Sequence, residues 1–315
     1  HGGAKKASTS MTFKNRIEFG LVLALTIFVW MVGASAGEPA SKRVKLLATG
    51  NSFSHNAMTY LPAIAKAGGD TLTLKEIVLS GAPLETHWRT AAAFQEGASN
   101  AQAIAWRVLK EEKWDFVTFQ QASANSFKLE TYQPFAKQLR DFIKTQAPTA
   151  EVLVHETWAY REDDPLFKKG FTQSDMYWGL RKAYETIAGE LGCRLIPVGD
   201  AFQNARADAA WKGVFPDPHF DYQSPAYPAL PNQARSLNIG HSWKTGKDGK
   251  PALSLDARHA NTAGRYLAGA VWYEFLFEHS VVGNAFMPKE LSADDVASLQ
   301  RIAHQTVTDG LKPKP

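Results

Sequence analysis

The sequence predicts an α/β fold in which helices cover both faces of a parallel sheet. Short β-rich runs alternate with longer helical runs between residues 44 and 198. Several of the β-rich runs are apolar throughout, which is typical of strands covered on both faces. Strand, helix and strand repeated in this way form right-handed crossovers, so the strands lie parallel. Hydrophobic residues make up 44% of the chain, which is ample for a core.

The predicted elements follow one another in a regular order. Strands are expected at residues 45–49, 73–79, 116–120, 151–157 and 194–198. Helices are expected at about residues 57–66, 100–112, 131–146 and 173–191. Because ligands bind at the carboxyl ends of parallel strands, residues that follow a predicted strand are candidates for a site. These residues are Ser52, Gly81, Gln121 and Trp158.

The alternation stops between residues 215 and 250, where prolines and glycines are dense. A stretch this long is usually a functional loop or a disordered one. Its aromatic residues favour an ordered loop over the active end of the sheet: Phe220, Tyr222, Tyr227 and Trp243. A helix is expected from about Asn261, and a last helix from Ser292, whose spacing to Asp295 is a capping signal. Since no repeat is found, residues 37–315 are expected to form a single domain.

Residues 11–36 have the three parts of a secretory signal. These are a basic start (Lys14, Arg16), an apolar run (19–32) and a small-residue end at Ala36. Cleavage after Ala36 would leave a secreted or periplasmic protein, and residues 1–10 are expected to be an upstream remnant. The alternative is an uncleaved membrane anchor, because the apolar run approaches the ~17 residues that can span a bilayer.

Removal of residues 1–36 changes the charge of the chain. It takes away the cations Lys5, Lys6, Lys14 and Arg16 and the anion Glu18, a net of +3, so the formal +4 falls to +1. The sequence pI of about 9.0 is therefore largely due to the leader, and nucleic acid is not expected as a partner. The single cysteine, Cys193, excludes an intramolecular disulfide and is expected to be a small buried hydrophobe.

Two distant segments carry the groups that nucleophilic catalysis needs. Ser52 follows the first predicted strand, and Asp256 and His259 precede a C-terminal helix. A serine hydroxyl needs a neighbouring base, and that base works best when a carboxylate fixes its tautomer. The three-residue spacing allows Asp256 to accept a hydrogen bond from the ring Nδ1, which leaves Nε2 to face Ser52. His55 is an alternative base, although it is expected in the first helical turn, where it would shape the pocket.

The segment Gly50-Asn51-Ser52-Phe53-Ser54 and the pair Asp256-x-x-His259 resemble motifs of the SGNH (GDSL-like) hydrolase superfamily. The resemblance covers roughly residues 44–279. It implies a three-layer α/β/α fold with a flavodoxin-like five-stranded parallel sheet, and it assigns Ser52 as nucleophile with His259 and Asp256 as its partners. It further implies an oxyanion hole that includes the amides of Ser52 and Gly81.

The third motif departs from the family pattern, which places an asparagine after the third strand. This chain has Gln120-Gln121-Ala122-Ser123 there, similar to carbohydrate and sialate O-acetylesterases. A glutamine amide can donate a hydrogen bond as asparagine does, so Gln121 is assigned as the third oxyanion donor. Gln120 and Asn125 remain as alternatives.

Aromatic and polar residues after the strands are candidates for substrate binding. His87, Trp88 and Trp158 are expected to line the cleft, together with Asn125. Trp158 could instead pack against the sheet edge, and the sequence does not decide between the two. His219-x-Asp221 and His155-Glu156 lack the spacing of a dedicated metal site, so no metal or other cofactor is expected.

These features predict an esterase that removes a small acyl group, acetyl, from a carbohydrate through an acyl-enzyme. The substrate would be a small molecule or a polysaccharide, with no stable membrane association after cleavage of the signal. Alternatives are a short-chain lipid or thioester esterase and an acyltransferase with the same triad. A protein of another class, an inactive glycan-binding module, would use the same cleft without turnover.

Overall fold

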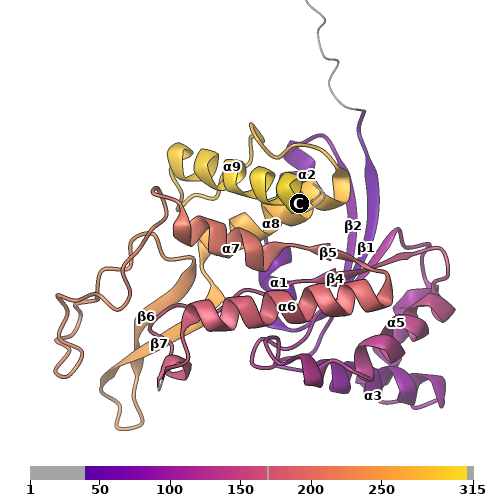
Figure 1. The fold of residues 1–315 in the computed structure, drawn as a ribbon, viewed down its shortest axis with the longest axis horizontal. Coiled ribbons are helices and arrows are strands. Elements are labelled where there is room, and N and C mark those ends of the chain that lie inside the picture. The colour runs from indigo at the N-terminus through magenta and orange to yellow at the C-terminus, as the bar shows by residue number, and fades with distance from the viewer. Residues whose placement is uncertain (1–39, 169, 311–315) are drawn as a thin grey trace, which may run out of the picture. The chain divides into compact units, whose positions relative to one another are not determined.

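The computed structural model describes residues 40–168 and 170–310, and its central element is a five-stranded parallel sheet (Figure 1). The strand order is β2-β1-β3-β4-β5. The strands are β1 (Arg43–Gly50), β2 (Thr71–Val78), β3 (Phe116–Phe119), β4 (Glu151–His155) and β5 (Arg194–Ile196). The predicted three-layer α/β/α fold is therefore confirmed, with every expected strand in place.

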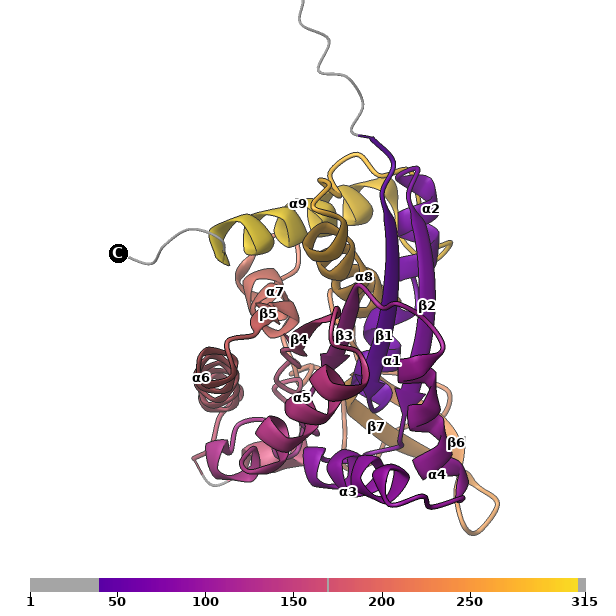
Figure 2. The same ribbon diagram turned by 90° about the vertical axis from the view of Figure 1, so that its right-hand side faces the viewer.

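Helices form a layer on each side of this sheet (Figure 2). One layer contains α3 (Leu84–Gln95), α4 (Ala101–Ile104), α5 (Phe135–Gln146) and α6 (Gln173–Leu191). The other is built around α8 (Thr262–Phe277), and its remaining helices are α1 (Ser52–Met58), α2 (Leu61–Ala67), α7 (Val198–Ala207) and α9 (Ala293–Gly310). Three short 3₁₀ helices, η1 (Ala105–Lys110), η2 (Leu129–Thr131) and η3 (Pro165–Phe167), lie in connections.

The range 57–66, expected to form one helix, contains the end of α1 and most of α2, because the helical conformation is interrupted between them. Pro62 lies in the first turn of α2, where no intrahelical acceptor exists for the N–H that proline lacks. In the interior of one continuous helix it would remove a backbone hydrogen bond. The helix expected at residues 100–112 changes from α4 to the 3₁₀ helix η1 within that range. Helices α3 and α7 were not predicted.

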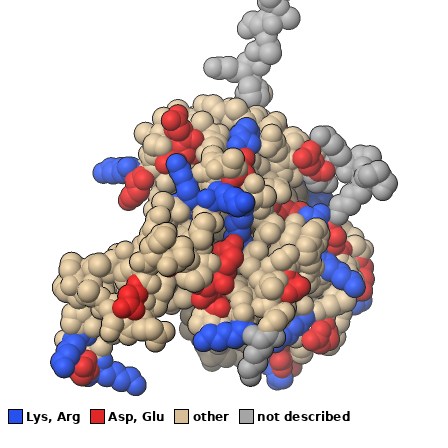
Figure 3. All heavy atoms as spheres, turned by 60° about the vertical axis from the view of Figure 1, so that its left-hand side comes forward, with Lys and Arg blue, Asp and Glu red and all other residues tan. Residues whose placement is uncertain are grey.

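The prediction of a loop at residues 215–250 is wrong in its second half, which contains the first strand and the turn of an antiparallel hairpin. The strands of this hairpin are β6 (Asn238–Thr245) and β7 (Pro251–Ala260), which pair with each other in a separate two-stranded sheet. The hairpin and the loop before it project from the parallel sheet, and in Figure 3 the charged side chains of this projecting part gather mainly at its tip. β7 returns from the hairpin tip to the sheet and leads into α8, so it carries Asp256 and His259 to the edge where β1 ends.

The signal sequence predicted for residues 11–36 lies outside the described residues. Within residues 40–168 and 170–310, no helix is both long and apolar enough to cross a membrane.

Candidate active site

Ser52 is the first residue of α1, and a single residue, Asn51, separates it from the end of β1. Asn51 caps this helix, since its side-chain oxygen accepts a hydrogen bond of 3.0 Å from the N–H of Phe53. Gly50 is fixed by close packing, because a Cβ there would clash with Ser54 Oγ. As the first helical residue, Ser52 also has an N–H without an acceptor inside the helix. Its hydroxyl and its amide are thus both positioned at the carboxyl end of a central strand.

The structure brings Ser52, His259 and Asp256 together in one line. Ser52 Oγ lies 2.9 Å from Nε2 of His259, and Nδ1 of the same ring lies 2.9 Å from Oδ2 of Asp256. Because an ionised carboxylate only accepts hydrogen bonds, Nδ1 carries the proton and Nε2 accepts from the serine hydroxyl. This is the arrangement in which a histidine serves as the base for a serine nucleophile.

Asp256 is held in its ionised form by three hydrogen bonds. The hydrogen bond from the His259 ring is the largest cause that lowers the pKa of this carboxyl well below its usual value. The backbone N–H groups of His259 and Arg258 also donate to Oδ1, over 3.0 and 3.1 Å. The carboxylate therefore stays charged through the neutral range, where it fixes the tautomer of His259 and can stabilise the imidazolium.

The end of β7 is braced from three directions. Asn56 of α1 accepts a hydrogen bond of 3.0 Å from the N–H of Ala260, which ties the helix of Ser52 to the strand of His259. The carbonyl of Arg258 accepts from Trp158 Nε1 over 2.9 Å and from Asn238 Nδ2 over 3.1 Å. No sequence pattern indicated Asn56 or Asn238, since their roles depend on contacts between distant segments.

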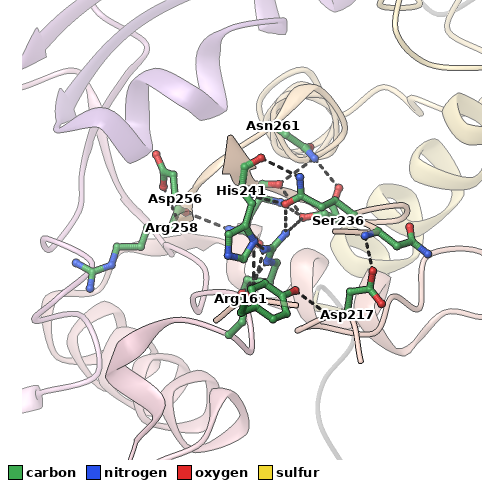
Figure 4. Close-up of polar contacts among 12 residues, drawn as sticks. Arg161, Asp217, Ser236, His241, Asp256, Arg258 and Asn261 are labelled. Atoms are coloured by element: carbon green, nitrogen blue, oxygen red, sulfur yellow. Dashed lines mark hydrogen bonds and ion pairs between the residues drawn. The ribbon is translucent and has the colours of Figure 1, made fainter. Parts of the chain in front are cut away.

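A buried arginine links this brace to the long loop (Figure 4). The backbone N–H of Arg161 donates to the carbonyl of Ala257 over 2.8 Å. Its guanidinium forms a two-pronged ion pair with Asp163, over 2.8 and 2.7 Å, and contacts Gln233 and Ser236. Only 2% of Arg161 is exposed, so this cluster fixes the loop before β6 against the strand that carries Asp256 and His259.

Gln121 does not reach the oxyanion position assigned to it. Its Nε2 donates both protons to Thr131, to the carbonyl over 2.9 Å and to Oγ1 over 3.1 Å. Its Oε1 accepts from the N–H groups of Leu84 and Ala122, over 3.0 and 2.9 Å. With every polar atom of the side-chain amide engaged, Gln121 joins α3 to the loop after β3 and has no proton to donate to a substrate.

Gln120 is engaged in the same way, by residues that flank Ser52. Its Oε1 accepts from Ser54 Oγ over 2.5 Å, and its Nε2 donates to Asn51 Oδ1 over 2.8 Å and to the carbonyl of Gln121 over 3.3 Å. Asn125 is half-buried, and no hydrogen bond of its side chain is recorded within the described part of the chain. The candidate donors that remain are the amides of Ser52 and Gly81, with Asn125 as a third.

Gly81 lies in the loop after β2 and adopts a φ of +62°. This is the left-handed region that glycine enters without strain. A Cβ at this position would meet no atom within 4 Å, so the conformation rather than lack of space calls for glycine.

Two of the four predicted substrate-binding residues are buried and do not line an open cleft. Trp158 is 0% exposed, because its ring stacks between Phe53 and Phe202 at centroid distances of 4.4 and 4.6 Å. His87 is 1% exposed, and Trp88 is half-buried against the hydrophobic core. The side chains of Trp158 and His87 thus turn inward. Trp88 and Asn125, both half-buried, stay candidates for substrate contact.

The remaining histidines also have structural surroundings. His55 is largely exposed and pairs with Glu76 over 3.0 Å, while Ser52 faces His259 instead. His155 is fully buried beside Ser54 and packs edge-on against Trp272. Among the residues that the structure describes, no group of three or more His, Cys, Asp or Glu side chains is placed to hold a metal ion.

Comparison with family models assigns the chain to a family. Residues 45–230 match the model of DUF4886, a domain of unknown function. The chain belongs to the DUF4886 family. The matched range includes Ser52 and Gly81 but ends before Asp256 and His259, which the hairpin of this DUF4886 protein supplies. No curated protein matches this chain.

Solved structures with a similar fold include another member of the family. A DUF4886 family protein from Bacteroides uniformis ATCC 8492 is 24% identical with a TM-score of 0.67, over 86% of this chain and 97% of that one. A candidate SGNH hydrolase from Slackia heliotrinireducens is 22% identical with a TM-score of 0.47, over 74% and 98%. A lipase/acylhydrolase from Enterococcus faecalis is 11% identical with a TM-score of 0.43, over 73% and 94%. At these identities the likeness concerns the fold.

Proposed function

We propose that this DUF4886 protein is a serine esterase of the SGNH type. The observation that carries the proposal is the line of hydrogen bonds from Ser52 Oγ through His259 to Asp256, each 2.9 Å long. A hydrogen-bonded network with a purely structural role would be expected to lie buried, yet 39% of the His259 side chain is exposed. The nucleophile and base can therefore meet a substrate from solution.

The proposed reaction has two steps. Ser52 Oγ attacks the ester carbonyl while His259 Nε2 takes the hydroxyl proton, and Asp256 stabilises the imidazolium that forms. The oxyanion would accept hydrogen bonds from the N–H groups of Ser52 and Gly81. His259 then gives its proton to the leaving alcohol, and an acyl-enzyme remains. Water, deprotonated by His259, attacks this ester and releases the acid with Ser52 restored.

We favour a small acyl group, acetyl, on a carbohydrate hydroxyl as the substrate. Support comes from polar side chains linked to this end of β7: Arg258 precedes His259, and its guanidinium lies over the ring of Tyr160, whose hydroxyl is 3.0 Å from Ser123 Oγ. Trp158 does not support a carbohydrate substrate, because its ring is covered by Phe53 and Phe202 and cannot stack on a sugar. The proposal thus rests on hydrogen-bonding groups rather than on an aromatic platform.

Hydrolysis assays on the full chain test this function. Acetate, butyrate and octanoate esters of p-nitrophenol would be compared, with acetate release from acetylated xylan and other acetylated glycans alongside. We expect turnover of the acetate ester to exceed that of the octanoate ester and to vanish in Ser52→Ala. Preference for octanoate would favour a lipid esterase. Glycan binding without turnover in the folded wild type would favour a binding module.

A further inference from the structure

Arg258 stands between Ala257 and the candidate base His259 on β7, and its side chain is 48% exposed. The guanidinium lies over the ring of Tyr160, 4.6 Å from its centroid. Tyr160 is 1% exposed and its hydroxyl is 3.0 Å from Ser123 Oγ, so the ring is a fixed platform. An arginine is held in one orientation when its guanidinium stacks on an aromatic face and also donates hydrogen bonds along one edge.

Asp164 occupies only one edge of this guanidinium. Nε donates to Oδ2 over 2.8 Å, and Nη2 donates to Oδ1 over 3.2 Å. The Asp164 side chain is 3% exposed and also accepts from the N–H of Leu166 over 2.8 Å. Its carboxylate is therefore satisfied inside the protein, and it serves to hold the arginine in place.

The other edge of the Arg258 guanidinium faces outward. Within the described ranges 40–168 and 170–310, no acceptor is recorded for the two N–H groups of Nη1 or for the second N–H of Nη2. One proton of Nη1 and one of Nη2 point the same way in an arginine, and this pair matches the two oxygens of a carboxylate. The open edge is thus a ready-made fork for an anionic group.

Arg161 shows what a purely structural arginine looks like in this fold. Its Nε, Nη1 and Nη2 all have partners, and the residue is 2% exposed. Figure 4 shows Arg161 among Ser236 and His241, whereas the Arg258 side chain points away from that cluster. The backbone N–H of Arg161 donates to Ala257, so the two arginines are close to each other at the end of β7. They differ in how many of their side-chain N–H groups have a partner.

Arg258 lies near Ser52 and His259, as the distances among the neighbouring aromatic rings show. The ring of Phe53, next to Ser52, lies 5.8 Å from the His259 ring and 6.5 Å from the Tyr160 ring. Arg258 on its Tyr160 platform and the imidazole therefore flank one aromatic side chain. A substrate held at Ser52 could reach the open edge with a group a short distance from its ester.

We infer that Arg258 is a specificity residue that binds a carboxylate of the substrate, so the substrate class is an acylated acidic carbohydrate such as a hexuronate. This inference rests on the proposed esterase function and narrows its substrate. A sugar carboxylate can accept both open N–H groups, whereas a neutral hydroxymethyl group offers one oxygen in its place. Charge-assisted hydrogen bonds of this kind change affinity by about 10-fold or more.

The test uses two esters that differ only in this group, an acetylated methyl glucopyranoside and the acetylated methyl glucopyranosiduronate. The readout is the ratio of kcat/KM for the acidic over the neutral ester. We expect wild type to prefer the acidic ester, and Arg258→Gln to lower the ratio by about 10-fold. Arg258→Lys, which keeps the charge but loses the fork, should give an intermediate ratio. An equal fall with both esters would mean a merely structural bridge and would overturn the inference.

Arg301 offers a matched control. It pairs with Asp208 over 2.8 Å with 45% of its side chain exposed, but it lies on α9. Arg301→Gln should leave the ratio unchanged. A third ester, the acetylated methyl glucopyranoside 6-phosphate, separates a carboxylate site from a phosphate site, and preference for it would contradict the assignment.

Failure of the inference is distinguishable from failure of the proposed function. Ser52-dependent hydrolysis of p-nitrophenyl acetate reports the function alone. Calorimetry on Ser52→Ala reports binding of the acidic and neutral esters without turnover. Tighter binding of the acidic ester that disappears in the Ser52→Ala, Arg258→Gln double variant supports the site, and equal binding of both esters by Ser52→Ala rejects it.

Discussion

The indole Nε1 of Trp158 donates a hydrogen bond of 2.9 Å to the carbonyl oxygen of Arg258, the residue before His259. The loop after β4 and the end of β7 are joined by this bond, although the two residues are 100 positions apart in the chain. Trp158 thus stabilises the strand that carries His259, the candidate base, and its buried ring is not open to a substrate.

Trp158→Phe tests this role because phenylalanine can still stack between Phe53 and Phe202 but cannot donate. We expect kcat for p-nitrophenyl acetate to fall by about 10-fold with little change in KM, since the loss acts on the geometry of His259. Trp272→Phe is the control, because Trp272 is buried as completely and its Nε1 has no recorded partner among the described residues. Equal kinetic effects in the two variants would contradict a specific brace.

Gln121→Ala separates a structural amide from an oxyanion donor. Removal of the side chain leaves the buried N–H groups of Leu84 and Ala122 without their acceptor, which should lower the free energy of unfolding by roughly 2–4 kcal/mol. In protein that remains folded, kcat should fall by less than about 10-fold, whereas a lost oxyanion donor costs about 10²–10³-fold. Urea unfolding and steady-state kinetics measure the two effects, and a rate loss in the larger range would restore the oxyanion role.

Gly81→Ala tests whether the amide of Gly81 acts in the site. Alanine at a φ of +62° is strained and should lower stability by about 1 kcal/mol. Gly192 has the same φ of +62° and equally open space where a Cβ would lie, but it ends α6. We expect similar losses of stability in Gly81→Ala and Gly192→Ala, with a fall in kcat in the first alone. An unchanged kcat in both would remove Gly81 from the oxyanion hole.

Two buried histidines predict that the protein loses stability in acid. Burial lowers the pKa of His87 to about 4, partly offset by the Gly50 backbone, and burial lowers the pKa of His155 to about 3. Below about pH 6.5 these residues gain protons in the unfolded chain but not in the folded one. Stability should therefore fall as pH drops from about 6.5 towards these values, by roughly 2 kcal/mol per histidine between pH 7 and pH 5.

His87→Leu provides the check on this prediction. Urea unfolding at pH 7 and pH 5 should show a smaller acid loss in the variant, by roughly 2 kcal/mol, because one titrating group is gone. The same loss in variant and wild type would show that His87 does not set the acid sensitivity.

The sequence was informative about strands and about the order of chemical groups. The apolar runs that gave β1, β3 and β4 can be buried on both faces only in a sheet of this kind, so their class was predictable. The hairpin was missed because proline and glycine dominate the range before and between its strands. Both strands do show the period-two alternation of a β-strand, in Trp243 and Thr245 on β6 and in Leu253 and Leu255 on β7. This signal is weak beside the dense turn residues.

The sequence predicted the candidate reacting groups of the site but not the residues that support them. Ser52 could be proposed because it follows a predicted strand, and Asp256 and His259 because they precede a predicted helix at a three-residue spacing that suits their chemistry. The roles of Gln120 and Gln121 could not, because the partners of an amide depend on contacts with Asn51, Leu84 and Thr131 from separate segments. Burial of Trp158 likewise depends on Phe202 of α7, a helix that was not predicted.

Covalent trapping would show directly whether Ser52 is an activated nucleophile. The folded full chain would be incubated with diethyl p-nitrophenyl phosphate, which phosphorylates an activated serine and releases p-nitrophenolate, and the adduct would be mapped by peptide mass spectrometry. We expect one diethylphosphoryl group on Ser52, absent in Ser52→Ala and much slower to form in His259→Ala. An unlabelled folded wild type, or the same label elsewhere in both wild type and Ser52→Ala, would contradict Ser52 as the nucleophile.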